Sequence, residues 1–167
     1  MTNKNNTILI TGCSTGIGYS TAKFLQQRGF RVIASARKAE DVARLNSEGF
    51  ETVQLDLANS DSIQQAVTTV LEWTDGKLDA LFNNGAFGQP GAVEDLSRDV
   101  LRQQFETNFF GTHELTNLII PVMRRQGYGR IIYNSSVLGF VAMKYRGAYN
   151  ASKFALEGLV DTLGLEL

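Results

Sequence analysis

The sequence is poor in the residues that build disulfides and metal sites. It contains one cysteine, Cys13, and one histidine, His113. A disulfide within the chain is therefore impossible, and a metal site made of cysteine and histidine ligands is not expected. Lysine and arginine number 16 against 17 aspartate and glutamate residues, which leaves a formal net charge of −1. This balance gives no electrostatic reason to expect a nucleic acid or an anionic membrane as a partner.

Long apolar runs are also missing. No stretch reaches the roughly 18 apolar residues that a membrane-spanning helix needs. The first ten residues, MTNKNNTILI, lack the apolar core of a signal peptide. We therefore expect a cytoplasmic protein. The 167 residues fit a single domain, and a hydrophobic content of 43% is sufficient for a packed core.

Short apolar runs alternate regularly with segments whose apolar residues have helical spacing. This alternation is typical of an α/β fold in which helices cover both faces of a parallel sheet, and right-handed crossovers make that sheet doubly wound. We predict strands over residues 7–11, 31–36, 51–56, 77–83 and 129–135. We predict helices over residues 16–28, 39–47, 60–74 and 97–125, followed by a helix that holds Tyr149.

Polar and glycine residues follow every predicted strand. In chain order, these clusters are Gly12–Gly16, Arg37–Lys38, Asp56, Asn83–Gly85 and Ser135–Ser136. The carboxyl ends of parallel strands meet at one edge of a sheet, and open α/β sheets bind ligands at that edge. Five such clusters at one edge predict a ligand site there.

The first cluster belongs to the stretch TGCSTGIG, which spaces Gly12, Gly16 and Gly18 as G-x-x-x-G-x-G. This is neither the common G-x-G-x-x-G fingerprint nor a P-loop, which places Lys and Ser or Thr after its last glycine. A glycine-rich turn before a helix can bring backbone N–H groups and the helix dipole to a phosphate. The pattern also suits a tight turn without a ligand, so the motif alone leaves both interpretations open.

Read together with the later motifs, this glycine spacing resembles the short-chain dehydrogenase/reductase family, from residue 7 to residue 167. The family's Asn-Asn-Ala-Gly motif is similar to Asn83-Asn84-Gly85-Ala86, in which the last two residues are exchanged. The stretch "NFFG" and the glycine loop are most similar to the steroid and retinol dehydrogenase branch. Ser136 fits the family serine better than Ser135 does, because it precedes Tyr149 by thirteen residues.

The resemblance implies a Rossmann-type fold and a set of site residues. The catalytic residues would be Asn108, Ser136, Tyr149 and Lys153, and Ser136 would also bind the substrate. The cofactor-binding residues would be Gly12, Ser14, Thr15, Gly16, Ile17, Gly18, Arg37, Asp56, Leu57, Asn83, Gly85, Tyr149 and Lys153.

Tyr149 and Lys153 stand four residues apart, which places them on the same face of a helix. A free phenol ionises at about pH 10. An ammonium about 4 Å away favours the phenolate by up to ~4 kcal/mol at an effective dielectric of about 20. The pair is therefore suited to exchange a proton with a substrate oxygen near neutral pH. The resemblance also assigns Lys153 to the nicotinamide ribose.

Two features have a structural as well as a functional interpretation. Asn108 lies on the apolar face of its predicted helix, where a buried amide needs partners. It is either a core residue at a bend or, as the resemblance implies, the holder of a water for proton transfer. The apolar residues after Ser136 either line the site, which favours an apolar substrate, or pack beneath their own loop; they are Val137, Leu138, Phe140, Val141 and Met143.

The end of the second strand bears on the choice of cofactor. Enzymes that choose NAD usually place Asp or Glu there to hold the ribose 2′-hydroxyl, and this chain has Ala36. Arg37 follows at once and can meet a 2′-phosphate with two charge-assisted hydrogen bonds. We therefore predict NADP rather than NAD. The alternative is that Arg37 and Lys38 form only a solvated pair before the next helix.

The sequence ends at Leu167 within a helix that is apolar on two sides and is followed by no capping residue. We expect one side to pack in this domain and, as the resemblance implies, the other to pack on the same helix of a second subunit in a homodimer or homotetramer. We also expect the chain to be the N-terminal portion of a longer domain, without its last strand and helix, and to be inactive by itself.

These motifs predict an NADP(H)-dependent oxidoreductase that transfers a hydride between nicotinamide and the carbonyl or hydroxyl carbon of an apolar alcohol, ketone or aldehyde. The alternative is a non-catalytic dinucleotide-binding module that senses redox state on the same fold. The presence of Ser136, Tyr149 and Lys153 favours the enzyme, because a sensor needs the phosphate cradle but not the proton-transfer pair. No metal is expected.

Overall fold

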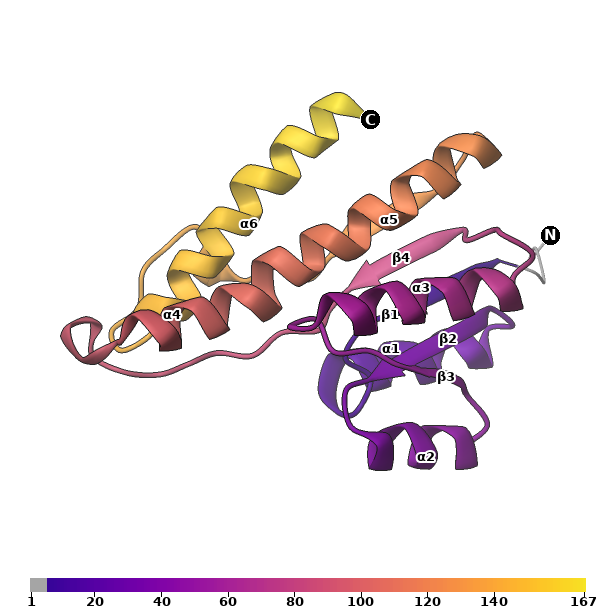
Figure 1. Ribbon diagram of the computed structural model, residues 1–167, viewed down its shortest axis with the longest axis horizontal. Coiled ribbons are helices and arrows are strands. Elements are labelled where there is room, and N and C mark those ends of the chain that lie inside the picture. The colour runs from indigo at the N-terminus through magenta and orange to yellow at the C-terminus, as the bar shows by residue number, and fades with distance from the viewer. Residues whose placement is uncertain (1–5) are drawn as a thin grey trace.

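In the computed structural model, which describes residues 6–167, five strands form one parallel sheet in the order β3-β2-β1-β4-β5. Figure 1 labels β1, β2, β3 and β4. The strands are β1 (Thr7–Ile10), β2 (Arg31–Ala36), β3 (Glu51–Gln54), β4 (Ala80–Asn83) and β5 (Arg130–Tyr133). The chain moves outward from β1 to β3 and then returns to place β4 on the other side of β1. The switch point, at which the strand order reverses direction, therefore lies between β1 and β4. Open α/β sheets bind ligands at this point. The predicted doubly wound α/β fold is confirmed.

Within residues 6–167, six α-helices connect or follow the strands: α1 (Gly16–Gln27), α2 (Ala39–Ser47), α3 (Ser60–Trp73), α4 (Arg98–Phe105), α5 (Gly111–Gln126) and α6 (Gly147–Glu166). Two of them begin at the side-chain caps that such sequences favour. Asn59 accepts the N–H of Ser62 at 3.0 Å before α3, and Ser97 accepts the N–H of Val100 at 3.3 Å before α4. The α5 helix ends at Gly127, whose φ of 76° is one that glycine adopts without strain.

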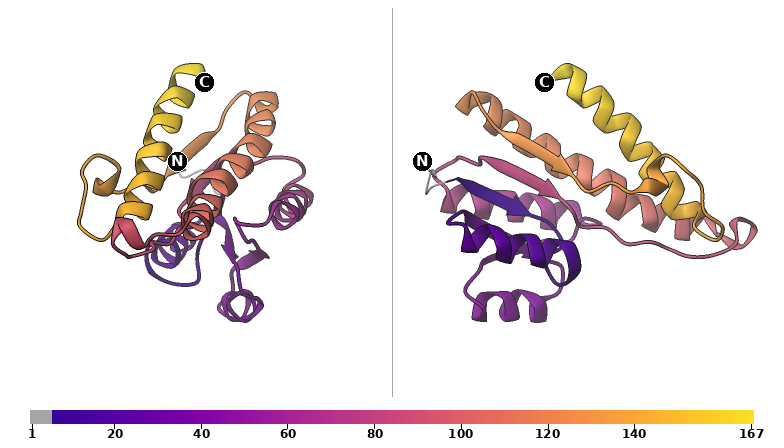
Figure 2. Two further views of the ribbon diagram at one scale, coloured as in Figure 1. Left: turned by 60° about the vertical axis from the view of Figure 1, so that its left-hand side comes forward. Right: turned by 180° about the vertical axis from the view of Figure 1, so that it is seen from behind.

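The two faces of the sheet bury separate cores, because side chains alternate along each strand. Leu9 and Ile33 belong to the core that α3 and α5 cover. Their chain neighbours Ile8 and Val32 belong to the core beneath α1 and α2. Figure 2 shows these helices on either side of the strands. Among the described helices, none combines the length and the hydropathy that crossing a membrane requires.

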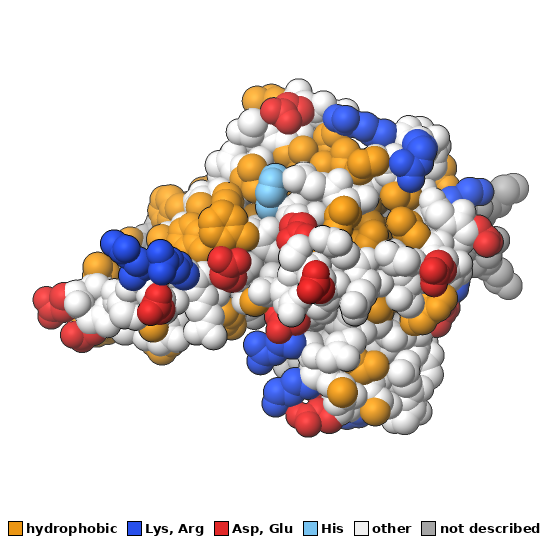
Figure 3. Space-filling view, viewed as in Figure 1, with side chains coloured by type: hydrophobic (Ala, Val, Ile, Leu, Met, Phe, Trp, Pro, Cys, Tyr) orange, Lys and Arg blue, Asp and Glu red, His pale blue; other side chains and the backbone are white. Residues whose placement is uncertain are grey.

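The predicted helix over 97–125 is interrupted. A π-helical turn, Glu106–Phe110, lies between α4 and α5, and it contains the fully buried Asn108. Near it, three phenylalanine rings pack with centroids 5.3 to 6.4 Å apart: Phe105, Phe109 and Phe110. Figure 3 shows hydrophobic side chains gathered on this part of the surface, and Phe110 is 51% exposed.

The last helix has one side covered and the other open, and its packing on a second subunit stays a prediction. Its buried residues include Ser152, Lys153 and Leu156 on the side that faces the domain. The opposite side is open, because Phe154 is 46% and Leu165 is 90% exposed. Only one of the two apolar sides is therefore covered within the described chain.

Residues 1–5 lie outside the described residues. They form the first half of the stretch MTNKNNTILI, which lacks a signal-peptide pattern.

Candidate active site

The glycine loop joins β1 to α1 at the switch point. Gly12 and Gly16 have φ values of +70° and +63°, which residues with a side chain rarely adopt. A methyl group on Gly12 would lie 2.8 Å from the Cα atom of Gly85, and one on Gly18 would overlap the carbonyl oxygen of Gly12. The glycines therefore permit two close backbone approaches, one within the loop and one to the loop after β4.

The hydroxyl of Thr11 fastens these two loops together. Its Oγ1 atom accepts the backbone N–H of Asn84 at 2.8 Å and that of Gly85 at 2.7 Å. In return, Asn84 Nδ2 donates to the Thr11 carbonyl oxygen at 2.9 Å. A methyl group on Gly85 would lie 3.0 Å from Leu57 Cδ1. The exchange of glycine and alanine in this motif therefore places the glycine at position 85, where space is short, and the alanine at position 86, which is exposed.

A cavity of about 570 Å³ opens beside the glycine loop. Six of the predicted cofactor residues line it: Gly12, Ser14, Arg37, Asp56, Leu57 and Gly85. Sequence reasoning missed further lining residues from the segment after β4 and from α4 and the π turn, namely Gln89, Gln103 and Thr107. Helix spacing carried no signal for the last two, because a polar residue that is exposed or partly exposed on a helix is ordinary.

Other predicted cofactor residues lie outside this lining. Ile17 is 60% exposed on the first turn of α1. Asn83 is buried, and its Nδ2 atom donates to Thr116 Oγ1 on α5 at 3.0 Å. Its side chain thus contacts the helix layer beneath the sheet. Thr15, Gly16 and Gly18 shape the loop and are not among the residues that line the cavity.

Lys153 is 97% buried, with an exposed fraction of 3%. Its Nζ atom donates to the carbonyl oxygen of Asn134 at 2.8 Å and lies 5.7 Å from the centroid of the Tyr149 ring. Burial lowers the pKa of Lys153, and the negative charge of Glu157 opposes that shift. The structure therefore brings together Tyr149 and Lys153, the pair predicted to exchange a proton with a substrate oxygen.

A chain of hydrogen bonds connects Lys153 to the glycine loop. Asn134, which Lys153 contacts, donates through Nδ2 to Asn84 Oδ1 at 2.9 Å, and Asn84 is bonded to Thr11. These residues follow β5, β4 and β1, three neighbouring strands. Sequence reasoning missed Asn134, although its place at the carboxyl end of a predicted strand was the same signal that singled out the other clusters.

The side chain of Asn108 holds the loop after β4. Asn108 Oδ1 accepts the N–H of Phe87 at 3.1 Å, while Nδ2 donates to the Phe87 carbonyl oxygen at 2.9 Å and to Ser152 Oγ at 3.2 Å. Gln104, which the sequence analysis did not single out, also donates to that carbonyl oxygen at 2.8 Å. Both ends of the Asn108 amide thus have partners, as the structural interpretation requires. The predicted role in proton transfer stays a prediction.

The two serines after β5 differ in their contacts. Ser136 Oγ accepts the N–H of Leu138 at 3.1 Å, at the start of the short 3₁₀ turn Val137–Gly139. Ser135 Oγ is buried and has no hydrogen-bond partner among the described residues. Neither serine lines the cavity beside the glycine loop or a cavity against Tyr149, and Ser135 lines a groove with Leu156 and Glu157 of α6. The assignment of the substrate oxygen to Ser136 stays a prediction.

A second cavity, of about 480 Å³, lies against Tyr149. Its apolar lining comes from the loop after β4 and the loop after β5: Ala86, Phe87, Leu138 and Met143. Most of the apolar residues after Ser136 do not pack beneath their loop, since Val137 is 69% and Phe140 is 66% exposed. Leu138 is the member of this set that is buried. This cavity shares Ala86 and Phe87 with the cavity beside the glycine loop.

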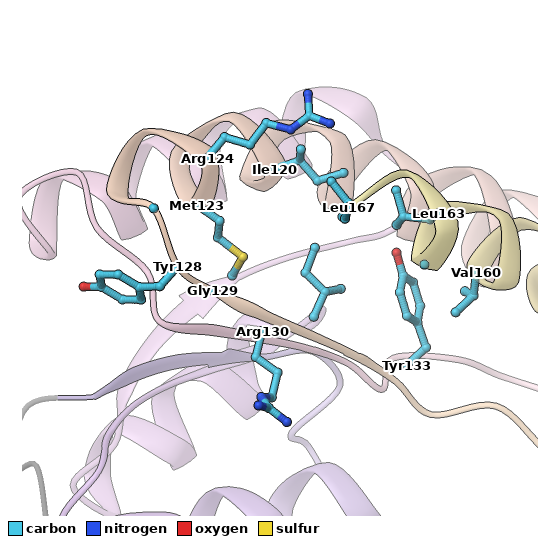
Figure 4. A pocket seen from close by; sticks show the side chains of 13 residues that line it. Ile120, Met123, Arg124, Tyr128, Gly129, Arg130, Tyr133, Val160, Leu163 and Leu167 are labelled. Carbon is cyan, nitrogen blue, oxygen red and sulfur yellow. The ribbon is translucent and has the colours of Figure 1, made fainter.

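A further groove, of about 600 Å³, lies between α5, β5 and α6 (Figure 4). Met123 of α5, Tyr133 of β5 and Leu163 of α6 are among its lining residues. None of the predicted site residues lines it, so we do not assign the chemistry to this groove despite its size. In residues 6–167, no cluster of three or more acidic, cysteine or histidine side chains is arranged to hold a metal ion.

The parallel sheet, the glycine loop at its switch point and the adjoining cavity define a Rossmann-type dinucleotide fold. The chain belongs to the short-chain dehydrogenase family, because the model of that family, described as "short chain dehydrogenase", matches residues 6–167.

Curated relatives support the family assignment. The chain is 47% identical over 160 residues to an uncharacterized oxidoreductase, YbbO, of Escherichia coli, and covers 60% of that protein with 96% of its own length. It is 37% identical to 3-ketodihydrosphingosine reductase of Bacteroides thetaiotaomicron and 34% identical to human retinol dehydrogenase 8. Each of these two alignments includes 96% of this chain, and they span 58% and 54% of the respective relatives. The chain thus spans a little over half the length of the curated relatives that it matches.

Solved structures agree with this assignment. A short-chain dehydrogenase from Streptomyces avermitilis superposes with a TM-score of 0.92 at 33% identity, over 99% of this chain and 62% of that one. A variant of actinorhodin polyketide ketoreductase, solved with NADPH, gives a TM-score of 0.89 at 30% identity, over 99% of this chain and 67% of that one.

Proposed function

We propose that the complete protein is an NADP(H)-dependent oxidoreductase that interconverts apolar alcohols with ketones or aldehydes. The observation that carries this proposal is the buried Lys153 beside Tyr149, joined through Asn134 and Asn84 to the glycine loop. Burying an ammonium has a free-energy cost that packing alone does not explain. The arrangement is accounted for if the lysine serves a reaction at the mouth of the cofactor cavity.

The glycine loop and its cavity fit a dinucleotide. Gly12 and Gly18 leave room for close backbone approach, and the N-terminus of α1 points its free N–H groups toward the loop. Arg37 lines the same cavity, and Gln54 Nε2 donates to its backbone carbonyl oxygen at 2.9 Å, which fixes the backbone there. When bound, the nicotinamide would supply or accept the hydride. NADPH in the ketoreductase structure supports this choice by similarity.

The proton chemistry belongs to the chain's own side chains. In the reductive direction, Tyr149 would donate its phenolic proton to the carbonyl oxygen, and Ser136 would donate a hydrogen bond to the same oxygen. The positive charge of Lys153 would favour the phenolate that remains. The apolar lining beside Tyr149 supports an apolar substrate. A redox-sensing module would not need Lys153 buried next to the tyrosine, so the structure favours the enzyme over that alternative.

We further propose that the complete protein works in the cytoplasm as a homodimer or homotetramer. The exposed side of α6, with Phe154 and Leu165, supports an assembly in which that side is covered. The exposed Phe110, the last residue of the π turn, supports the same view. The described chain by itself, with these surfaces open, is proposed to be inactive.

The test is the rate of NADPH oxidation by the complete protein with a panel of aldehydes and ketones. Tyr149→Phe should lower kcat by roughly 10²- to 10⁴-fold, because one acid/base group is lost while the ring still packs. Cofactor affinity should stay nearly unchanged. A variant that keeps more than about a tenth of the wild-type rate would show that Tyr149 is not the proton carrier.

The neighbouring serines provide a matched control. Ser136→Ala should lower kcat, whereas Ser135→Ala should have a smaller effect, since each change removes one hydroxyl at the end of β5. The opposite order of effects would assign the substrate oxygen to Ser135, whose hydroxyl has no other described partner.

A further inference from the structure

One cation in the cavity beside Tyr149 has no role in the proposed chemistry. Arg146 lines this cavity together with Tyr149 and the apolar side chains of the two loops, and it is the one charged residue among the described residues that do so. Its side chain is partly buried. The other side chains that line this cavity suit an apolar substrate, so an arginine among them is unusual. Its charged guanidinium must contact either water or a polar partner.

The residues that the structure describes supply no partner for this guanidinium. The five ion pairs found among the described residues do not include Arg146, and its side chain makes none of their hydrogen bonds. Its backbone is nevertheless held in place. The Arg146 N–H donates to Met143 at 3.3 Å, and its carbonyl oxygen accepts the N–H of Asn150 at 2.7 Å. A parallel bridge joins it to Gly91. The structure thus fixes the position of an unpaired cation three residues before Tyr149.

The dinucleotide does not account for this cation. The cavity beside the glycine loop includes Arg37 but not Arg146, whereas the cavity beside Tyr149 includes Arg146 but not Arg37. Ala86 and Phe87 border both. A phosphate held at the glycine loop would therefore lie in the cavity that Arg146 does not line.

We propose that Arg146 is a specificity-determining residue that binds a carboxylate on the substrate, so that the preferred substrates are carbonyl compounds with an apolar body and an acidic group. A guanidinium matches a carboxylate with two parallel hydrogen bonds. The N-terminus of α6, where Arg146 is the capping residue, adds a positive dipole in the same place. This inference rests on the proposed function: a hydride reaches the carbonyl carbon and Tyr149 protonates its oxygen, while Arg146 holds the other end of the molecule.

The experiment compares acids with their uncharged esters in the complete protein. Succinic semialdehyde and azelaic semialdehyde, which differ in the length of chain between aldehyde and carboxylate, are assayed beside their methyl esters with NADPH. At least one acid should exceed its ester in kcat/KM by roughly 10-fold or more, the effect of one charge-assisted interaction. In Arg146→Met this preference should disappear while the kcat/KM for the esters is retained, and Arg146→Lys should keep part of it.

Lys144→Met is the matched control, because it removes a positive charge two residues away that lines neither cavity. It should keep the preference for the acid. Equal kcat/KM values for acids and esters in the wild type, or a preference that Arg146→Met leaves intact, would overturn the inference. Loss of the preference in Lys144→Met to the same extent would also overturn it, because general charge and not a site would then explain it.

Binding of octanoate, which cannot be reduced in this reaction, separates this inference from the proposed function. Calorimetric titration of the complete protein with bound NADP should show octanoate binding that weakens roughly 10-fold or more in Arg146→Met. Binding of this kind without reduction of any aldehyde would refute the proposed function and retain the carboxylate site. Reduction of the esters without octanoate binding or acid preference would refute the site alone.

Discussion

Replacing Thr11 by valine should test whether the two loops at the switch point depend on one hydroxyl. Valine keeps the shape of threonine and removes the oxygen that accepts the N–H groups of Asn84 and Gly85 at 2.8 and 2.7 Å. Thr11 itself is only 1% exposed. Neither N–H group has a second acceptor among the hydrogen bonds of the described residues, so valine leaves both without a partner.

The magnitude follows from two unpaired donors. A buried donor that loses its acceptor costs about 1–3 kcal/mol, and the lower half of this range applies because Asn84 and Gly85 are only partly buried. We expect the free energy of unfolding of Thr11→Val to fall by about 2–4 kcal/mol. For a protein of this size or larger, that is a drop in Tm of roughly 4–16 °C. Cofactor affinity should fall as well, because Gly85 and Gly12 form one wall of the cavity.

Urea unfolding of the complete protein, followed by circular dichroism, measures this difference. Thr11→Ser is the control, since it keeps the accepting oxygen and loses one methyl group, a change of about 0.8 kcal/mol. A Thr11→Val variant within about 0.5 kcal/mol of wild type would refute the reasoning. So would a Thr11→Ser variant that is less stable than Thr11→Val.

Two further predictions concern the cofactor and pH. Arg37→Ala should weaken NADPH binding roughly 10- to 150-fold and leave NADH binding nearly unchanged; equal wild-type dissociation constants for the two cofactors would contradict the assignment. Burial raises the pKa of the Cys13 thiol from 9.0 to about 12, although a backbone hydrogen bond with Ser35 opposes the shift. The unfolded thiol therefore ionises first, and stability falls as pH rises above 9.0. The loss should reach about 1.4 kcal/mol one pH unit higher, and Cys13→Ala, compared by urea midpoints, should not show it.

Much of the fold could be predicted because its signals are local. Strands β1 and β2 are buried runs of mostly apolar residues, and the predicted bounds of β2 and α2 agree with the structure. The π turn could not be predicted in this way. The spacing from Leu101 to Leu115 reads as one helical face, and no glycine or proline marks Glu106–Phe110. The turn is accompanied by contacts of Asn108 with Phe87 and Ser152, which only the tertiary structure brings near.

The direction of the Asn83 side chain could have been predicted from the alternation of side chains along its strand. Side chains two residues apart on a strand share a face. Leu81 is buried in the core beneath α3 and α5, so Asn83 should face the same helices, and its bond to Thr116 shows that it does. Alternation along β4 therefore separates the two asparagines. Asn83 contacts the helix layer, and Asn84 contacts the glycine loop.

The hydrogen bonds that support the candidate site also hold the edge of the sheet together. Lys153, Asn134 and Asn84 form a line across the carboxyl ends of β5 and β4 that ends at Thr11 after β1. Asn134, Asn84 and Thr11 are bonded in the same order in which β5, β4 and β1 lie side by side in the sheet. In the sequence, these three residues are far apart. The carbonyl of Asn134 that accepts from Lys153 partly offsets the cost of burying the ammonium. The position of Tyr149 and Lys153 relative to the cavity beside the glycine loop is therefore set by strand order. This explains why local motifs could name these two residues but neither Asn134 nor the hydrogen bonds that connect Lys153 to the glycine loop.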